Sequence, residues 1–308
     1  MQVLNGIDFI PAFAKGAAVA IGNFDGVHRG HQTLIATAVG RARELGRPSG
    51  VIVFEPHPRQ YFAPGQPHFH LTPLNEKLRV LAALGLKLVV VLPFDARMAS
   101  LTAEAFIEDV LVSNLSVSHV VIGYDFFFGR KRGGNPQTMR EAGARLGFGV
   151  SVVEPVAQDG EVFSSSEIRL KLARGDVAGA AQALGRNWRV SGRVIGGAKR
   201  GTGMGFPTAN VPMPQGTALG HGIFAVHAII DGLRHEAAAY LGTRPTFDDG
   251  MPVLEVFLFD FDGDLYGRDM TVEFIAFIRP DRKFADAGEL VAQMEKDVAE
   301  ARRLLAGP

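Results

Sequence analysis

Short apolar runs that alternate with helix-like segments restrict the fold of this chain more than any other feature of its sequence. Residues 17–21, 50–54 and 120–122 are apolar or glycine, and 86–92 contain one charged residue. The segments between these runs carry apolar residues three and four apart, as amphipathic helices do. Strands that are apolar on both sides are typical of parallel sheets covered by helices. The first half is therefore predicted to be a doubly wound, parallel-sheet α/β domain.

Capping signals predict where several of these helices begin. Thr72 followed by Pro73 is the pattern of an N-cap and a first-turn proline, and Thr102 also stands where a cap is expected. Asn135 before a proline is a third such signal. The segment 55–71 contains four prolines and is predicted to be a long loop.

The second half of the chain has a different pattern. From 188 to 278 we expect short strands separated by glycines and turn dipeptides, and we expect a hairpin turn at Asp262-Gly263. This pattern predicts an antiparallel β-barrel, followed by an amphipathic helix at 287–305. The chain of 308 residues is long enough for two domains, which we place at 1–184 and 185–308.

Composition excludes several classes of protein. Lys+Arg and Asp+Glu are both 32, so the net charge of +0 predicts no nucleic-acid partner and no membrane partner. The absence of cysteine excludes disulfides, thiolate zinc sites and thiol nucleophiles. No apolar stretch reaches the roughly 18 residues of a membrane helix. We expect a soluble, cytoplasmic protein, and a homo-oligomer is one of the states left open.

The first candidate site lies in AAVAIGNFDGVHRGH at 17–31. The glycine-flanked turn at 22–26 follows a predicted strand, at the sheet edge where ligands bind. His28 and His31 are three residues apart near a helix start, where imidazoles and backbone N–H groups can hold phosphate. Gly30 allows a nucleotide close to the backbone. A βα turn with two solvated histidines is the alternative, and the strand–turn–helix context favours the phosphate site.

The second candidate site lies in GRVIGGAKRGTGMGFPTAN at 192–210. Its glycines suit a phosphate-wrapping loop, although neither the Walker A nor the G-x-G-x-x-G spacing is present. On a strand Thr208 and Asn210 share one face, and their oxygens suit Mg²⁺. A flexible surface loop followed by a solvent-facing strand edge is the alternative.

Four segments of the first half carry a family resemblance. GNFDGVHRGHQ at 22–32, FEPHPRQYF at 54–62, GYDFFFG at 123–129 and SSSEIR at 164–169 resemble the adenylyltransferase module of bifunctional riboflavin kinase/FAD synthetases, which are H-x-G-H nucleotidyltransferases. The resemblance implies transfer of AMP from ATP to FMN with release of pyrophosphate, and it implies His28 and His31 as catalytic groups. The ATP- and flavin-binding residues that it implies are Gly22, Asn23, Phe24, Asp25, Gly30, Asp125, Ser164, Ser165 and Arg169.

The second half resembles the flavokinase module of the same family. GFPTAN at 205–210, GIFAVHA at 222–228, YLGTRPTF at 240–247, LEVFLFDFDGDLYG at 254–267 and VEFIAFIRPDRKF at 272–284 follow the family order. The resemblance implies phosphorylation of riboflavin, with Mg-ATP on Thr208 and Asn210 and with Glu255 as the general base. The nucleotide- or flavin-binding residues that it implies here are Gly201, Gly203, Gly205, Pro207, Thr208 and Asn210.

Several positions leave alternatives open. Glu167, Gly196 and Tyr240 stand where the family commonly has Arg, His and Asn. These departures are the only support for a flavin-binding regulator with degenerate sites, and another H-x-G-H adenylyltransferase is a further alternative. Without the resemblance, Glu255 would be an ordinary exposed strand carboxylate. The resemblance implies ATP, riboflavin and FMN as ligands.

A histidine pair in the proline-rich segment is the last feature of note. His68 and His70 could bind a metal ion, but their place in this segment favours a mobile surface loop, which could act as a lid over the flavin.

Overall fold

The computed structural model describes residues 1–158, 160–196, 206–214, 216–243 and 252–307. It divides into two compact units, Met1–Ser165 and Ser166–Pro308. Residues 166–184, which we expected at the end of the first domain, contribute their contacts to the second unit.

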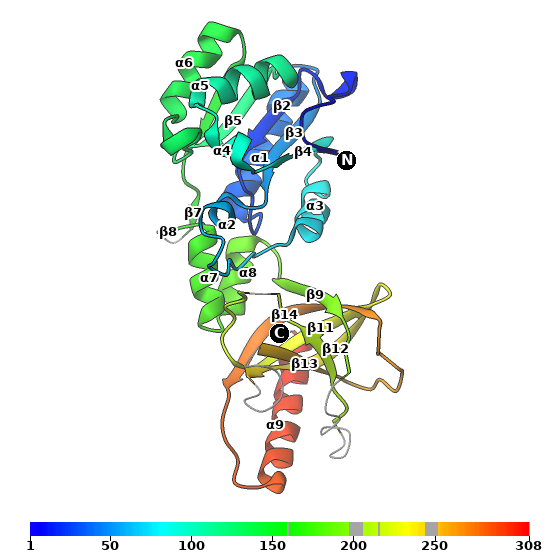
Figure 1. The fold of residues 1–308 in the computed structure, drawn as a ribbon. Coiled ribbons are helices and arrows are strands. Elements are labelled where there is room, and N and C mark those ends of the chain that lie inside the picture. The colour runs from blue at the N-terminus through cyan, green and yellow to red at the C-terminus, as the bar shows by residue number, and fades with distance from the viewer. Residues whose placement is uncertain (159, 197–205, 215, 244–251, 308) are drawn as a thin grey trace. The chain divides into compact units, whose positions relative to one another are not determined.

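The first unit contains a six-stranded parallel sheet with the strand order β1-β4-β3-β2-β5-β6. Helices cover both of its faces (Figure 1). The strands are β1 (Gln2–Asn5), β2 (Ala18–Ile21), β3 (Ser49–Glu55), β4 (Leu88–Pro93), β5 (His119–Gly123) and β6 (Gly149–Val153). The helices are α1 (Arg29–Glu44), α2 (Pro58–Phe62), α3 (Leu74–Ala82), α4 (Ala96–Ser100), α5 (Ala103–Ala105), η2 (Phe106–Asn114) and α6 (Pro136–Leu146), with short 3-10 turns η1 (Ala12–Ala14) and η3 (Arg130–Arg132). The predicted α/β class is confirmed.

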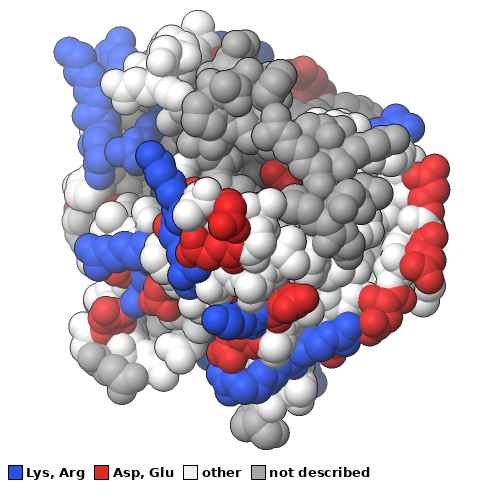
Figure 2. Space-filling model, turned by 90° about the horizontal axis from the view of Figure 1, so that it is seen from below, with Lys and Arg blue, Asp and Glu red and all other residues white. Residues whose placement is uncertain are grey.

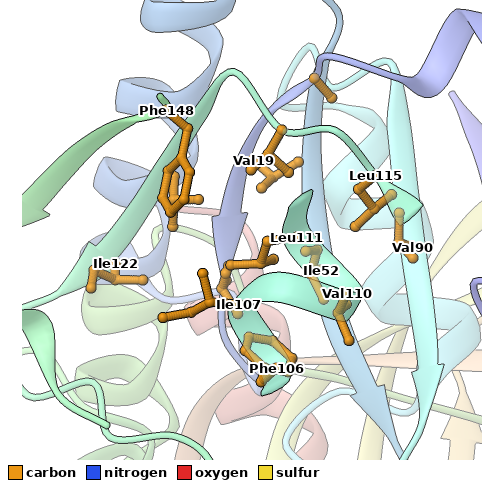
Figure 3. Close-up of a cluster of buried hydrophobic side chains, with 14 of the residues drawn as sticks. Val19, Ile52, Val90, Phe106, Ile107, Val110, Leu111, Leu115, Ile122 and Phe148 are labelled. Atoms are coloured by element: carbon orange, nitrogen blue, oxygen red, sulfur yellow. The ribbon is translucent and has the colours of Figure 1, made fainter. Parts of the chain in front are cut away.

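Alternation of side chains along each strand produces two cores. Val19 of β2 belongs to the core that packs against η2, whereas its neighbour Ala20 belongs to the core that packs against α1 and α3. Figure 3 shows the first of these cores, in which Val19 and Ile52 of the sheet lie beside Ile107 and Leu111 of η2. Burial on both faces is the reason that these strands are apolar throughout.

Two local predictions in this unit are wrong. The segment 55–71 is not all loop, because it contains α2. Thr72 does not cap α3. Its hydroxyl accepts a hydrogen bond from the backbone N–H of Gly26 at 2.9 Å, and Pro73 takes the N-cap position. A long-range partner thus displaces the local capping contact.

The other two caps are confirmed. The Thr102 hydroxyl accepts the N–H of Ala105 at 3.1 Å, and the Asn135 side chain accepts the N–H of Thr138 at 3.0 Å. The helix that follows Thr102 continues as the π-helix η2.

The second unit begins with the helices α7 (Ser165–Ala173) and α8 (Val177–Leu184). Six antiparallel strands follow in the order β10-β13-β12-β11-β14-β9. A bridge between Ile195 and Asn210 links the two ends of this order, so the sheet is a nearly closed barrel, as predicted. The strands are β9 (Arg189–Arg193), β10 (Ala209–Pro212), β11 (Gly222–Ile230), β12 (Leu233–Thr243), β13 (Pro252–Leu258) and β14 (Asp269–Pro280). A two-stranded ribbon, β7 (Ala157–Gln158) with β8 (Glu161–Val162), completes the chain's strands in the described residues.

The hairpin expected at Asp262-Gly263 is wrong, because β13 pairs with β10 and β12 rather than with β14. The tight hairpin joins β11 to β12 through Asp231 and Gly232, whose φ angles are 49° and 81°. Positive φ at both central residues is the requirement of a type I′ turn.

An ion-pair network around one buried carboxylate joins three strands of the barrel. Glu273 on β14 is 4% exposed and accepts hydrogen bonds from Arg189 at 2.6 and 3.0 Å and from Arg234 at 2.5 Å. Burial alone would raise the pKa of Glu273, but the hydrogen bonds and charges of the two arginines outweigh it and hold the pKa below 4.5.

The terminal helix α9 (Ala287–Leu305) covers one side of the barrel. Its Ala301 is buried against Ala225 and Phe259.

Lys and Arg lie beside Asp and Glu on the face shown in Figure 2. None of the helices in the described residues has the length and apolar character needed to cross a membrane.

Candidate active sites

The first candidate site lies where the strand order of the parallel sheet reverses. β2 and β5 are neighbours at this point, with β3 beyond one and β6 beyond the other. The turn at 22–26 follows β2, and residues 124–125 follow β5. Ligands of open α/β sheets bind at such a switch point, outside the carboxyl ends of the strands. The structure thus brings together two of the segments that the sequence indicated.

The turn after β2 holds a strained backbone. Phe24 and Val27 have φ angles of 48° and 44°, although both are fully buried side chains and neither is glycine. Positive φ is costly for a branched residue such as Val27, and it persists where the surrounding structure imposes it. Both residues belong to the segment that the sequence assigned to the nucleotide.

The two histidines lie in contact at the start of α1. His28 is its N-cap, and His28 Nδ1 accepts the backbone N–H of His31 at 3.4 Å. The two rings stack with their centroids 3.7 Å apart. A Cβ placed on Gly30 would lie 3.1 Å from His28 Cε1, so the close packing of the His28 ring against the backbone at this position favours glycine.

His31 is poised as an uncharged hydrogen-bonding group. Burial, followed by the charges of His28 and Lys77, lowers the pKa of His31 well below 6.5. Its Nδ1 and the side-chain oxygen of Asn23 are buried, and neither has a hydrogen-bond partner among the described residues. Buried polar atoms without partners are rare and costly, so a bound substrate is the natural partner for both.

Asp25 positions backbone segments within this site. Its carboxylate is 2% exposed and accepts the N–H of Leu71 at 3.2 Å and of Thr72 at 3.1 Å. Its backbone oxygen accepts the hydroxyl of Ser165 at 2.8 Å. Asp25 therefore ties the turn to two distant segments of the unit, and Ser165 lies at the site as expected, next to the half-buried Ser164.

Two residues near Asp25, Lys77 and His57, were not assigned to this site from the sequence. Burial lowers the pKa of Lys77, which is 2% exposed, while Asp25 and Glu55 oppose that shift. Burial and then His68 are the main causes that lower the pKa of His57 to about 3. Nothing in the helical pattern around Lys77 distinguishes it from a surface lysine, because its burial results from tertiary packing.

The histidine pair is not on a free surface loop. Phe69 between His68 and His70 is 6% exposed, and one ligand atom from each histidine and from Asp25 lie within 4.8 Å of one another. These three residues could hold a metal ion.

The two other residues expected here are Asp125 and Arg169. Asp125 is exposed just beyond β5, and its Oδ1 would lie 3.1 Å from a Cβ on Gly123. Arg169 is half-buried on α7 and belongs to the second unit, as does Glu167.

The second candidate site lies on β10 and β13. Asn210 is directly opposite Glu255 in the antiparallel register, and the Thr208 hydroxyl donates to Glu255 Oε2 at 3.3 Å. Asn210 is 4% exposed, Thr208 and Glu255 are half-buried, and Pro207 is exposed. The structure therefore unites the three residues that the sequence assigned to metal binding and proton transfer. Gly201, Gly203 and Gly205 lie outside the described residues.

The donor set on β10 and β13 fits a hard cation. A hydroxyl, a carboxamide and a carboxylate all offer oxygen, which Mg²⁺ prefers.

Tyr240 on β12 pairs with Glu255 from the other side, and its hydroxyl donates to Asp281 at 3.0 Å. Gly196 is exposed, with open space around its Cα.

Comparisons with known proteins match both halves. Residues 10–167 match the family model described as FAD synthetase, and 184–305 match that described as riboflavin kinase. The bifunctional riboflavin kinase/FMN adenylyltransferase of Pseudomonas fluorescens is 40% identical over 307 residues, which cover 99% of this chain and 98% of that protein. The protein of the same name from Escherichia coli K12 is 39% identical over 306 residues, covering 98% and 97%.

A solved structure agrees with the fold of the chain. The crystal structure of a protein described as a macrolide-efflux protein from Streptococcus pneumoniae has a TM-score of 0.86 and 28% identity. The match covers 98% of this chain and 99% of that one.

Proposed function

Because this chain belongs to the bifunctional riboflavin kinase/FMN adenylyltransferase family, we propose that its two candidate sites divide two reactions between them. The protein is an enzyme that uses ATP to phosphorylate riboflavin to FMN and to adenylylate FMN to FAD, with release of pyrophosphate. The family matches support this activity over a flavin-binding regulator or another H-x-G-H adenylyltransferase.

The switch-point site of the first unit serves adenylylation in this proposal. The phosphate of FMN is itself the nucleophile that attacks the α-phosphorus of ATP, so the protein must position the two and stabilise charge. Uncharged His31 donates one imidazole N–H to a phosphate oxygen, and His28 acts beside it. The side-chain oxygen of Asn23 is a hydrogen-bond acceptor, so the partner that it lacks in the described structure would be a donor of the substrate, such as a sugar hydroxyl, rather than a phosphate oxygen.

Further contacts with the phosphates come from groups around the turn. The backbone N–H groups at the start of α1 face an anion favourably. Lys77 supplies a buried positive charge close to His31, as its influence on the pKa of His31 indicates. We assign Ser164, Ser165 and Arg169 to the same phosphates, and Asp125 to the nucleotide or flavin.

The barrel site serves riboflavin phosphorylation. Glu255 accepts the proton of the ribityl 5′-hydroxyl as that oxygen attacks the γ-phosphorus of ATP, whose bond to the bridging oxygen breaks to release ADP. The Thr208 hydroxyl, which donates to Glu255, orients the carboxylate. Once the proton has moved, Glu255 is neutral and returns its proton to solvent after product release.

Thr208 and Asn210 would hold magnesium with the nucleotide. When bound, Mg²⁺ neutralises charge on the phosphate oxygens of ATP. Since both reactions consume ATP, we also propose that the enzyme works in the cytoplasm, and that ATP, riboflavin and FMN are its ligands.

The observation that most supports this division is the convergence of Thr208, Asn210 and Glu255 on neighbouring strands. A single experiment tests it. The full-length protein is incubated with riboflavin and Mg-ATP, and the flavins are separated over time. FMN should appear first and FAD afterwards, and FAD should form directly when FMN is supplied. Flavin binding without turnover would contradict the proposal.

The domain boundary can be tested with fragments. We propose that 185–308 folds alone and phosphorylates riboflavin, as the predicted boundary requires. A fragment covering 166–308 should be more stable, because the N–H of Gly220 donates to the oxygen of Leu172 on α7 at 2.9 Å. Thermal melts and kinase rates of both fragments check this. An unfolded 185–308 fragment would show that α7 and α8 are integral to the kinase unit.

A further inference from the structure

We propose that Asp25, His68 and His70 form a binding site for a transition-metal dication of the zinc type, separate from the magnesium that accompanies ATP. One ligand atom from each of these residues lies within 4.8 Å of the others. Two ligands of one tetrahedral zinc ion lie about 3.3 Å apart, given zinc–ligand distances of about 2.0 Å. The remaining contraction is within reach of rotations of the two half-buried imidazoles.

The chemistry of the three donors selects the class of metal. Two imidazoles and one carboxylate suit Zn²⁺, Co²⁺ and Ni²⁺, whereas Mg²⁺ and Ca²⁺ prefer sites built from oxygen alone. This set therefore differs from the oxygen donors of Thr208 and Asn210 on the barrel. Three protein ligands leave a fourth position for water.

The surroundings hold the ligands in place. Asp25 accepts the N–H groups of Leu71 and Thr72, which directly follow His70. The segment that supplies two ligands thus also orients the third, as outer hydrogen bonds commonly do at metal sites.

His57 lies beside the site and packs against one of the proposed ligands. Its ring centroid is 4.5 Å from that of His68. Its Nδ1 already accepts the N–H of Arg59 at 3.1 Å, which caps α2.

The charges around the site permit a dication. Lys77 is a nearby positive group; burial lowers its pKa overall, and two carboxylates, Asp25 and Glu55, partly oppose that shift. Two negative groups therefore oppose one ammonium. A metal here would fix the segment of His68 and His70 to the turn that carries Asp25.

The test uses Co²⁺ alone with the full-length protein, without ATP or flavin, so its result is independent of the proposed catalytic roles. One equivalent should give the intense visible absorption of tetrahedral Co²⁺, which Zn²⁺ abolishes and excess Mg²⁺ does not. The double variant His68→Asn/His70→Asn should lose at least about tenfold in affinity. The matched control His221→Asn, at an exposed histidine of the second unit, should bind as the wild type does.

A second measurement needs no variant. Zn²⁺ should protect His68 and His70 from diethyl pyrocarbonate in the wild-type protein, read by peptide mass, while His221 stays reactive. The proposal is overturned if the wild type gives no intense band, if the double variant retains it, or if Zn²⁺ protects neither histidine.

Discussion

Replacement of Glu255 by Gln isolates proton transfer at the barrel site. Glutamine keeps the size of the side chain and one oxygen that can accept the Thr208 hydroxyl, but it cannot take a proton. General-base catalysis contributes about 10²–10⁴-fold, which corresponds to about 3–5 kcal/mol of activation free energy. Riboflavin phosphorylation should therefore slow by that factor.

The contacts of Glu255 also set a limit on the structural damage. The Thr208 hydrogen bond is long at 3.3 Å, and a neutral acceptor replaces a charged one, so weakening this bond should lower the free energy of unfolding by about 1.5 kcal/mol. Riboflavin and ATP should bind with nearly unchanged affinity, because the proton moves only along the reaction path.

The assay follows FMN formation from riboflavin and FAD formation from FMN as separate initial rates. Only the first should fall, because adenylylation uses a phosphate that is already anionic. Glu236→Gln, at an exposed glutamate on the adjacent β12, is the matched control and should leave both rates unchanged. Wild-type kinase turnover in Glu255→Gln would refute the reasoning. Loss of both activities together with a lowered melting temperature would indicate misfolding.

Two further predictions concern the adenylylation site and the acid stability of the barrel. His28→Ala and His31→Ala should each slow FAD formation from FMN by about 10²–10³-fold, as loss of one charge-stabilising donor does, and should leave FMN formation from riboflavin unchanged. Near-normal FAD synthesis in both variants would exclude this role, and His221→Ala serves as the control. Because the pKa of Glu273 is held below 4.5 in the folded state, its stabilising contribution is present above that value and is lost as the pH falls through the folded pKa. Urea unfolding followed by the fluorescence of Trp188, whose ring centroid lies 5.1 Å from that of Phe274, should therefore show stability falling with acid, and Glu273→Gln should flatten that dependence. An equally steep pH dependence in the variant would assign the effect to other groups.

Local sequence determined most of the helices and strands, and it indicated the chain segments in which the two candidate sites lie. The strands of the first unit are visible because burial on both faces requires apolar residues throughout, as in the run that becomes β2. His28 and His31 could be placed at a helix start because both lie within one turn of α1. Thr102 and Asn135 cap their helices as predicted, since a cap depends on N–H groups only three residues away.

Contacts between distant segments decided the rest. Thr72 looks like a helix cap in the sequence, but its hydroxyl accepts a hydrogen bond from the backbone N–H of Gly26, 46 residues away. Lys77 reads as a surface lysine, and only the packing of α3 buries it. The expected hairpin at Asp262-Gly263 failed because strand order in a barrel depends on which edges pair, and turn residues do not encode that.

The sites themselves depend on both levels. Sequence supplied Thr208 and Glu255 as separate residues, 47 positions apart, and the register of β10 with β13 put their side chains in contact. In the sequence, His68 and His70 are only a weak indication of a metal site in a proline-rich segment. In the structure, the Asp25 carboxylate accepts backbone N–H groups of that segment and holds it against the turn. Spacing along the chain reports what one helix or strand can present, whereas a carboxylate supplied by a distant loop becomes visible only once long-range hydrogen bonds and core packing bring the two segments together.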